Sequence, residues 1–341
     1  DTLKRQMESH LDQENQMTAL SAVMSDPGDL GRVKRDSGGQ MLAIVESAED
    51  QGRLPGGVTE SAEVNGGVYC FVGDWLWENL ARLRPSAGGE TFLTSLAAIG
   101  ADQGHNVDSV LIGDAQELLG VNDRRQLARA EAVQRQRVCQ GWMLAGVTIT
   151  DPDSVYIDAS VTIGQDTVIL PNTMLLGSTS IGEDCEIGPN TTIRDSSVGG
   201  RCRITSSAVE GATIENGVHI GPFSHLRPGA YLESDVYLGN YVEVKESRFS
   251  QGAVMGHFGY IGDASIGARA NLGAGLVTCN YDGKDKHRTN IGAEAFIGCD
   301  TMLVAPVSVG DNAITGAGAV ITKDVPAGRL SVGAAALIVD R

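Results

Sequence analysis

Two cations stand where a repeating chain would place them next to each other. Arg227 and Lys245 are eighteen residues apart, and each directly follows an aliphatic residue. If the chain completes one coil every eighteen residues, their side chains stack on one face about 4.8 Å apart. Like charges at that separation repel each other. One solution is a phosphate group held by both cations, and the other is a surface ion pair between Arg227 and Glu210, one coil earlier.

Groups suited to proton transfer lie close by in the same pattern. Glu243 is predicted to stack under Tyr260, round one corner of the coil from His257. A histidine near a carboxylate can act as a general base, although a lone histidine in a repeat is more often a surface residue. His219 and His225 fall on different faces, which argues against a three-histidine zinc site.

A six-residue repeat must position these groups. Apolar residues recur every six positions, occasionally five, from Ile163 to Leu272 and again from Ile291 through Ile314 to Val320. This period is the signature of a hexapeptide β-helix, in which three hexads close a triangular coil of about 18 residues. Stacked coils then bury one continuous aliphatic column.

The ladder is interrupted between Leu272 and Ile291. The insert LVTCNYDGKDKHRTN is therefore expected to loop out of the coil, and it carries Lys284, Lys286 and Arg288. Loops that project from a rigid scaffold often carry function. An ordinary solvated loop with a turn at NYDG is the alternative.

A different style of sequence precedes residue 146. Up to about residue 113, a helical stretch at 74–83 alternates with short apolar runs at 42–45 and 110–112, which indicates an α/β segment.

Residues 123–139 then mix Arg and Gln with small apolar residues at helical spacing, with Asn122 or Asp123 as the N-cap. This helix either joins two domains or ends the first one.

Composition excludes several classes of function. The 341 residues include 43 acidic and 26 basic ones, a net charge of −17, which argues against nucleic acid or an anionic membrane as partner. No apolar run approaches the ~18 residues of a membrane span. Six dispersed cysteines indicate reduced thiols in the cytoplasm. Because the first residue is Asp1, we expect a processed chain or a piece of a longer one.

The motifs LRPG, NYVEVK, GH…Y, NLGAG and CNYDG occur in this order between residues 220 and 323. This stretch resembles the bacterial bifunctional N-acetylglucosamine-1-phosphate uridyltransferase / glucosamine-1-phosphate N-acetyltransferase family. The resemblance implies a mainly β protein whose C-terminal left-handed parallel β-helix is preceded by the second part of an α/β nucleotidyltransferase domain. It also implies a homotrimer with active sites between adjacent subunits.

The resemblance implies a role for individual residues of the acetyl-transfer site. His257 corresponds to the general base and Glu243 to its orienting carboxylate. The implied binding residues for glucosamine-1-phosphate are Arg227, Lys245, Tyr260, Asn271 and Lys286, and those for acetyl-CoA are Ala274, Asn280, Tyr281, Cys299 and Ala317. Two positions depart from the family: Cys299 stands where serine is usual, and Ala334 stands near a usual arginine.

The N-terminal part resembles the second half of the family's uridyltransferase domain through LGRVKRD, AIVE, EVNGG and LLGVNDRRQLA. This implies a sugar site at Gly31, Glu46 and Asn65 and a Mg²⁺ ligand at Asn122. The family's glycine-rich loop, base contacts and aspartate ligand would lie before Asp1. The expected divisions are a partial uridyltransferase domain at 1–113, a linker helix at 114–145, the acetyltransferase β-helix at 146–325 and a tail at 326–341.

The implied reaction is transfer of acetyl from acetyl-CoA to glucosamine-1-phosphate. In the complete protein, a UTP- and Mg²⁺-dependent step would follow and give UDP-N-acetylglucosamine for peptidoglycan and lipopolysaccharide synthesis in the cytoplasm. Two alternatives stay open. One is a sugar-phosphate nucleotidyltransferase whose β-helix only assembles or regulates it, and the other is a non-catalytic β-helical scaffold.

Overall fold

The chain forms two compact units, residues 1–131 and 132–341, in a computed structural model. The structure describes residues 2–25, 27–28, 30–46, 61–86 and 88–333. Each unit has its own hydrophobic core. The division between them falls inside one long helix, and the units are described separately below.

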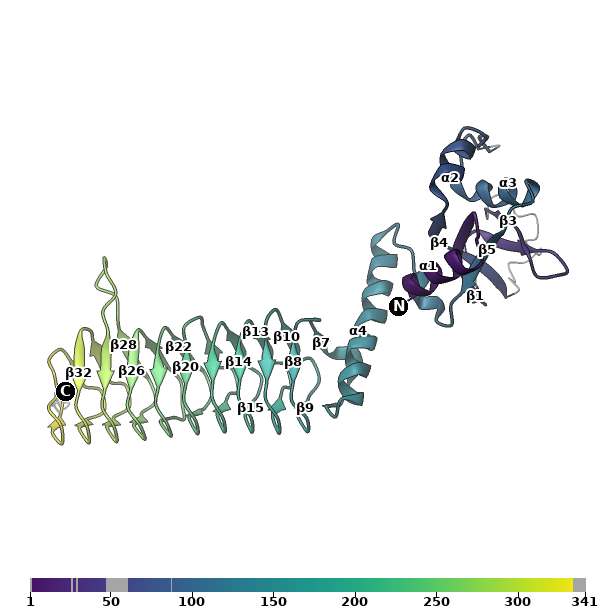
Figure 1. The fold of residues 1–341 in the computed structure, drawn as a ribbon. Helices are drawn as coiled ribbons and strands as arrows, with labels where there is room; N and C mark the ends of the chain where they lie inside the picture. The colour runs from purple at the N-terminus through teal and green to yellow at the C-terminus, as the bar shows by residue number, and fades with distance from the viewer. Residues whose placement is uncertain (1, 26, 29, 47–60, 87, 334–341) are drawn as a thin grey trace, which may run out of the picture. The chain divides into compact units, whose positions relative to one another are not determined.

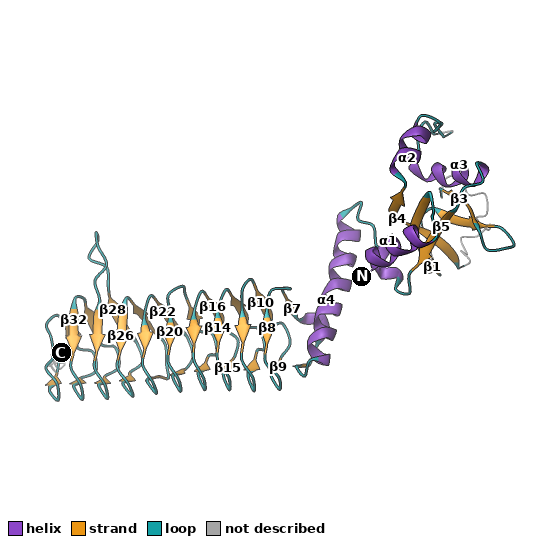
Figure 2. Cartoon of the chain, viewed as in Figure 1, coloured by secondary structure: helices purple, strands orange, loops and turns teal. Residues whose placement is uncertain are grey.

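The first unit is an α/β segment built on a five-stranded sheet of order β3-β2-β4-β1-β5 (Figures 1 and 2). β1 pairs antiparallel with β4 and parallel with β5. The strands are β1 (Met17–Met24), β2 (Arg32–Arg35), β3 (Met41–Val45), β4 (Ala62–Phe71) and β5 (Val107–Leu111). The helices are α1 (Thr2–Asp12), α2 (Gly73–Leu80), α3 (Leu96–Asp102) and the 3-10 turns η1 (Leu93–Ser95) and η2 (Ala115–Leu118). The helical stretch and both apolar runs expected from the sequence lie on α2, β3 and β5.

A charged network lies on this sheet. The Arg35 guanidinium donates to both Glu63 carboxylate oxygens at 2.8 Å and to Asp108 Oδ1 at 2.8 Å. Ser21 and Ser109 also donate to Glu63 Oε1. Burial raises the pKa of Glu63, but these hydrogen bonds outweigh it and hold the pKa at about 2.

Helix α4 (Arg124–Leu144) begins where the helix expected at 123–139 should begin and continues five residues beyond 139. It begins ten residues after the start of the linker helix expected at 114–145, and η2 lies in the intervening segment. Asp123 is its N-cap, because its Oδ1 accepts the backbone N–H groups of Arg125 and Gln126. Within the second unit, Cys139 is fully buried in the core, and Val138 and Trp142 pack against it. The last turns of α4 therefore cover the first coil.

The second unit is a parallel β-solenoid of three sheets, with one strand per sheet in each coil. Sheet 1 comprises β7 (Tyr156–Ile157), β10 (Met174–Leu176), β13 (Thr192–Arg194), β16 (Ala208–Glu210), β19 (His225–Leu226), β22 (Val242–Lys245), β25 (Gly259–Gly262), β28 (Leu276–Cys279), β31 (Met302–Val304) and β34 (Val320–Ile321). Sheet 2 comprises β8 (Thr162–Ile163), β11 (Ser180–Ile181), β14 (Ser197–Val198), β17 (Thr213–Ile214), β20 (Tyr231–Leu232), β23 (Arg248–Phe249), β26 (Ala264–Ile266), β29 (Thr289–Ile291) and β32 (Val307–Val309). Sheet 3 comprises β6 (Thr148–Ile149), β9 (Val168–Ile169), β12 (Glu186–Ile187), β15 (Arg203–Ile204), β18 (His219–Ile220), β21 (Tyr237–Leu238), β24 (Val254–Met255), β27 (Asn271–Leu272), β30 (Phe296–Ile297), β33 (Ile314–Thr315) and β35 (Leu330–Ser331). A short turn, η3 (Pro152–Ser154), precedes β7.

The predicted ladder is confirmed through most of its length, since its residues from Ile163 to Leu272 are all buried in one core. The prediction is wrong at the last two rungs. Ile314 is 43% and Val320 62% exposed, whereas Thr315 and Ile321 point inward. The prediction took a five-residue step from Val309 to Ile314. Because side chains alternate across a strand, that step exchanged inward and outward positions from there on. A step of six residues gives the inward positions that the structure shows.

The insert is also shorter than predicted. Residues Leu276–Cys279 form β28 of sheet 1, with Leu276 and Thr278 buried. A threonine in place of an aliphatic rung concealed this strand in the sequence. The segment that leaves the solenoid is residues 280–288, and it projects beyond the coil next to β28 (Figure 1).

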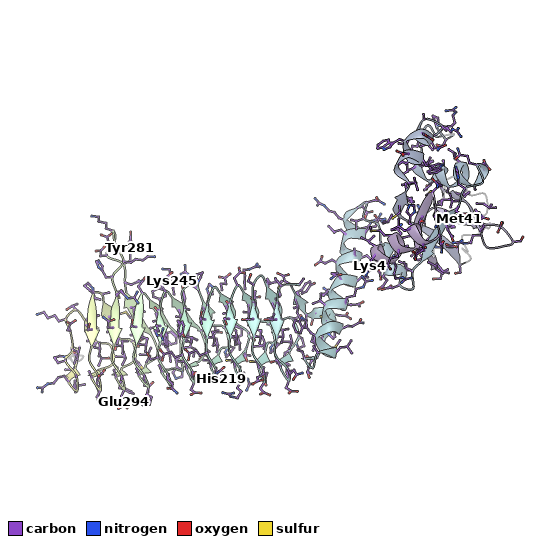
Figure 3. The ribbon with its side chains drawn as sticks, viewed as in Figure 1. Lys4, Met41, His219, Lys245, Tyr281 and Glu294 are labelled. Atoms are coloured by element: carbon purple, nitrogen blue, oxygen red, sulfur yellow. The ribbon has the colours of Figure 1, made fainter. Side chains whose placement is uncertain are left out.

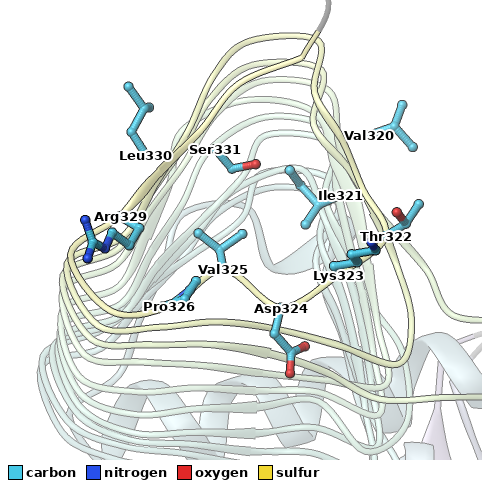
Figure 4. A pocket seen from close by; sticks show the side chains of 10 residues that line it. All are labelled: Val320, Ile321, Thr322, Lys323, Asp324, Val325, Pro326, Arg329, Leu330 and Ser331. Atoms are coloured by element: carbon cyan, nitrogen blue, oxygen red, sulfur yellow. The ribbon is translucent and has the colours of Figure 1, made fainter.

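The C-terminal coil contains a pocket of about 310 Å³ (Figure 4). Ile321 and Val325 line it beside Lys323, Asp324 and Arg329. In the described part of the chain, no helix is both long and apolar enough to span a lipid bilayer.

Candidate functional site

The two stacked cations lie on the outer face of sheet 1, as predicted. Leu226 pairs with Val244, which places Arg227 and Lys245 at equivalent positions of successive coils. Arg227 Nη1 donates to Glu243 Oε1 at 2.9 Å. The alternative ion pair between Arg227 and Glu210 is wrong, because Glu210 contacts His225 Nε2 at 3.1 Å instead.

The projecting loop brings a further cation to this face. The side chain of Lys286 comes near that of Lys245, and this neighbouring positive charge lowers the pKa of Lys286. Neither lysine forms an ion pair with a described carboxylate. Two neighbouring ammonium groups that form no ion pair are chemically suited to binding an anion. Figure 3 labels Lys245 on the solenoid and Tyr281 on the loop.

Tyr260 and Asn280 meet above the same sheet. Glu243 pairs with Tyr260 across the coils, as predicted. Asn280, which is 7% exposed, donates from Nδ2 to Tyr260 Oη at 3.4 Å and also to Asp263 Oδ2. Gly262 leaves the room for this meeting, because a Cβ at that position would overlap Tyr260 Oη and lie 2.7 Å from Asn280 Nδ2.

His257 lies at the corner between sheets 3 and 1, two residues before β25. It is exposed and forms no hydrogen bond or ion pair with any described residue. Glu243 bonds Arg227 rather than His257, so the predicted orienting contact is not formed in this chain.

At the corner where His257 lies, the next coils place a column of small residues. Ala274, Cys299 and Ala317 each follow an inward-facing residue by two positions, as His257 does. The carbonyls of Ala274 and Cys299 accept N–H groups from the next coil, those of Asp300 and Gly318. The N–H groups of Ala274, Cys299 and Ala317 have no acceptor among the described residues, so the column presents amides along one narrow edge.

Two predicted site residues, Asn271 and Tyr281, lie apart from the cluster that Arg227, Lys245, Tyr260, Asn280 and Lys286 form at sheet 1. Asn271 is exposed on β27 of sheet 3. Tyr281 is 60% exposed on the loop, and its backbone bridges that of Lys286. Asn280 was assigned to acetyl-CoA, yet its contacts are to Tyr260 and Asp263. Ala334 lies outside the described residues.

The predicted sugar site of the first unit comes together. The Asn65 N–H donates to Gly31 O at 2.8 Å, and a Cβ on Gly31 would lie 3.4 Å from Glu46 Oε2. Tyr69, which sequence reasoning missed, accepts from Asn65 Nδ2 at 2.7 Å. Burial raises the pKa of Tyr69, and the nearby Glu46 adds to the increase.

Asn122 lines a separate pocket of about 290 Å³ with Gly28, Leu118 and Arg129. Mg²⁺ prefers octahedral oxygen ligands that include carboxylates. Among the described residues this pocket supplies the neutral amides of Asn122 and Gln126 and a nearby arginine, and the described chain holds no group of three His, Cys, Asp or Glu residues that could bind a metal ion. These residues alone do not fit the ion, and no step is derived through it.

Comparison with known proteins finds relatives along almost the whole chain. The family described as bacterial transferase hexapeptide (six repeats) matches residues 160–195, 211–246 and 288–323. The bifunctional protein GlmU of Pelobacter propionicus is 41% identical over 97% of this chain and 72% of its own length. GlmU of Thermosipho africanus is 44% identical over 99% of this chain and 73% of its own length.

A solved UDP-N-acetylglucosamine acyltransferase from Francisella novicida is 20% identical. It covers 54% of this chain and 66% of its own chain, with a TM-score of 0.32. At this TM-score the likeness adds nothing to the assignment.

Fold and repeat together define a hexapeptide-repeat transferase built on a parallel β-solenoid. Within that class, this chain belongs to the family of bifunctional GlmU proteins. Both alternatives drawn from the sequence, a β-helix that only regulates and a non-catalytic scaffold, are disfavoured by that membership.

Proposed function

We propose that the solenoid transfers an acetyl group from acetyl-CoA to the amine of glucosamine-1-phosphate. The observation that carries the proposal is the meeting of Lys245, which stacks on Arg227 on sheet 1, with Lys286 from the loop, while neither lysine forms an ion pair with a described carboxylate. A purely structural coil gains nothing from two adjacent ammonium groups, whereas a sugar phosphate neutralises them.

In this proposal His257 accepts the proton that the amino group loses as its nitrogen attacks the thioester carbonyl. The N–C bond forms, the C–S bond breaks, and coenzyme A leaves with a proton on sulfur. The amide edge of Ala274, Cys299 and Ala317 lies along the same corner as His257, which suits it to a developing oxyanion and to the acyl carrier.

Sugar phosphate binding is assigned to the cluster on sheet 1. Arg227 offers a guanidinium fork, while Lys245 and Lys286 offer point charges. Tyr260 and Asn280 form the polar wall beside them. We assign Glu243 to holding Arg227, which replaces its expected role beside His257.

A homotrimer with shared sites is proposed on two observations. Asn271 belongs to sheet 3, so an Asn271 that reaches the phosphate cluster on sheet 1 has to come from a neighbouring copy. Phe223 and Tyr241 are 59% and 58% exposed, stacked at 5.2 Å, and both have positive φ. Bulky residues in that conformation are strained, and an exposed aromatic pair suits an interface.

For the first unit we propose the sugar-binding part of a uridyltransferase at Gly31, Glu46 and Asn65. We assign its UTP-dependent reaction to the complete protein, in keeping with the bifunctional proteins to which this chain is similar. We place the enzyme in the cytoplasm, where acetyl-CoA is made and thiols stay reduced.

The test is release of free coenzyme A from acetyl-CoA in the presence of glucosamine-1-phosphate. His257→Ala should lower kcat by roughly 10²–10⁴-fold and leave sugar phosphate binding nearly unchanged. His219→Ala, a histidine on sheet 3, is the control. Wild-type protein that releases no coenzyme A, or a His257→Ala variant as fast as wild type, would overturn the proposal.

A further inference from the structure

Asp263 occupies the corner between β25 and β26, beside the cluster on sheet 1. Its φ of +51° places it in the left-handed region. Its N–H donates to Lys245 O at 3.1 Å, its carbonyl accepts from Thr289 N–H at 3.2 Å, and its carboxylate accepts from Asn280 Nδ2. No sequence motif drew attention to it.

These contacts fall at both ends of the projecting loop. Asn280 is the first residue of the loop 280–288, and Thr289 begins β29 directly after it. The loop is closed above them by His287 N–H, which donates to Asn280 O at 2.8 Å, and by the bridge between Tyr281 and Lys286. The position of Lys286 therefore depends on how firmly the base of the loop is held.

Charge points to the same residue. Lys245 lowers the pKa of Lys286, while Asp263 and Tyr260 act in the opposite direction. Lys245, Asp263 and Tyr260 are the titratable groups of this part of the solenoid that act on Lys286, and the Arg227–Glu243 ion pair lies beside Lys245, on its own strand and the neighbouring one. Asp263 thus offsets part of the repulsion that the two ammonium groups exert before an anion binds.

We propose that Asp263 is a positioning residue for acetyl transfer: by holding both ends of the loop 280–288, it sets Lys286 beside Lys245 for the sugar phosphate. This inference rests on the proposed function for its catalytic consequence, whereas the clamp itself stands on the contacts alone.

A local role as a turn residue is the competing explanation, because Asp and Asn tolerate positive φ. The chain offers a matched control. Asp195 lies at the same corner of an earlier coil, has a φ of +47°, and its Oδ1 accepts from Ser178 N–H at 2.9 Å. It is remote from the loop, so Asp195→Ala reproduces the turn effect without the clamp.

The first readout is hydrogen–deuterium exchange of residues 280–288. In Asp263→Ala we expect exchange in this loop to be about 10-fold faster or more, as for loss of a charged hydrogen bond. Asp195→Ala should leave it unchanged. This readout needs no activity, so it decides the clamp even where acetyl transfer fails. Unchanged exchange in Asp263→Ala overturns the proposal.

The second readout is steady-state kinetics. Asp263→Ala should raise the KM for glucosamine-1-phosphate about 10-fold or more, with a much smaller change for unphosphorylated glucosamine. Sugar phosphate binding should weaken at alkaline pH, where Lys286 loses its proton, so KM should rise there. In Asp263→Asn the neutral amide still accepts a hydrogen bond from Asn280, but Lys286 loses its carboxylate neighbour. The rise of KM should therefore begin at a lower pH than in the wild type. A uniform fall in kcat that Asp195→Ala shares, with KM and its pH dependence unchanged, contradicts a positioning role.

Discussion

Arg227 and Lys245 stack as neighbours, yet only one of them has its charge balanced within the chain. Arg227 bonds Glu243, both side chains being about 40% exposed, whereas Lys245 faces Lys286. Replacing the two cations therefore has opposite effects on the empty protein.

We expect Lys245→Met to raise or preserve the melting temperature without ligand, because it removes a repulsion. The same change should raise the KM for glucosamine-1-phosphate about 10-fold or more. Arg227→Met leaves Glu243 half-buried without its partner and should lower the melting temperature. Melting curves with and without sugar phosphate measure both effects. A lower melting temperature for empty Lys245→Met, with unchanged KM, would contradict the anion site.

Gly262 is the second residue whose replacement is informative. Its φ is not positive, so alanine changes only the packing. The new Cβ would displace Tyr260 Oη and Asn280 Nδ2, at a cost of about 1–3 kcal/mol for overpacking. We expect Gly262→Ala to raise the KM for glucosamine-1-phosphate several-fold. Gly200→Ala, whose nearest contact would be Glu183 O at 3.2 Å, is the control. Equal kinetics in the two variants would show that the Tyr260–Asn280 contact is dispensable.

Periodicity alone was enough to place Arg227 next to Lys245, because the coil repeat is encoded locally. It could not find Gly262 or Asp263, since their roles depend on where the loop 280–288 returns to sheet 1. For the same reason, Lys286 entered the site only through the resemblance.

Among the elements, the corner column is the one most open to chemical attack. Cys299 is exposed, whereas the other five cysteines are buried or half-buried. Cys299 lies between Ala274 and Ala317 in the column.

A small alkylating reagent should therefore label Cys299 first and inactivate acetyl transfer in step with labelling. Acetyl-CoA should slow the loss, and Cys299→Ser should keep activity and resist the reagent. Mass spectrometry of the labelled peptide with parallel assays measures this. Full activity after complete labelling of Cys299 would remove the column from the acyl carrier's path.

The solenoid could be predicted almost strand by strand, because each rung is an aliphatic residue at fixed spacing. The errors came where the inward residue is a threonine. Because Thr278 is not aliphatic, the pattern missed strand β28. Because Thr315 is not aliphatic either, the pattern took the exposed Ile314 as the inward residue. Hydrophobicity identifies a buried position only when the residue there is apolar.

At the scale of the whole molecule, the two units have separate cores and should respond differently to acid. The carboxylate of Glu63 has an ordinary pKa of 4.5 in the unfolded chain and about 2 in the fold. Its stabilising contribution is therefore complete above about 4.5 and is lost as pH falls towards 2.

Calorimetry between pH 6 and pH 2 should show that the melting temperature of the first unit falls steeply below pH 4.5. The fluorescence of Trp75 and Trp77, which lie in that unit, is a second probe of the same transition. In Glu63→Gln the melting temperature of the first unit should already be lower at pH 6, and it should depend less on pH. A pH dependence identical in the two proteins would show that the Arg35–Glu63 network does not govern acid unfolding.

The in-register core also determines how such a chain can change in length. Ile157, Leu175 and Ile193 are eighteen residues apart, and each stacks on the next. Insertion or deletion of one complete coil keeps this register. It therefore moves the acetyl-transfer face along the solenoid axis without disturbing any contact within that face. A partial coil would turn every later side chain to the wrong face. Insertions and deletions before Arg227 are therefore expected to come in complete coils, with smaller differences confined to the corners.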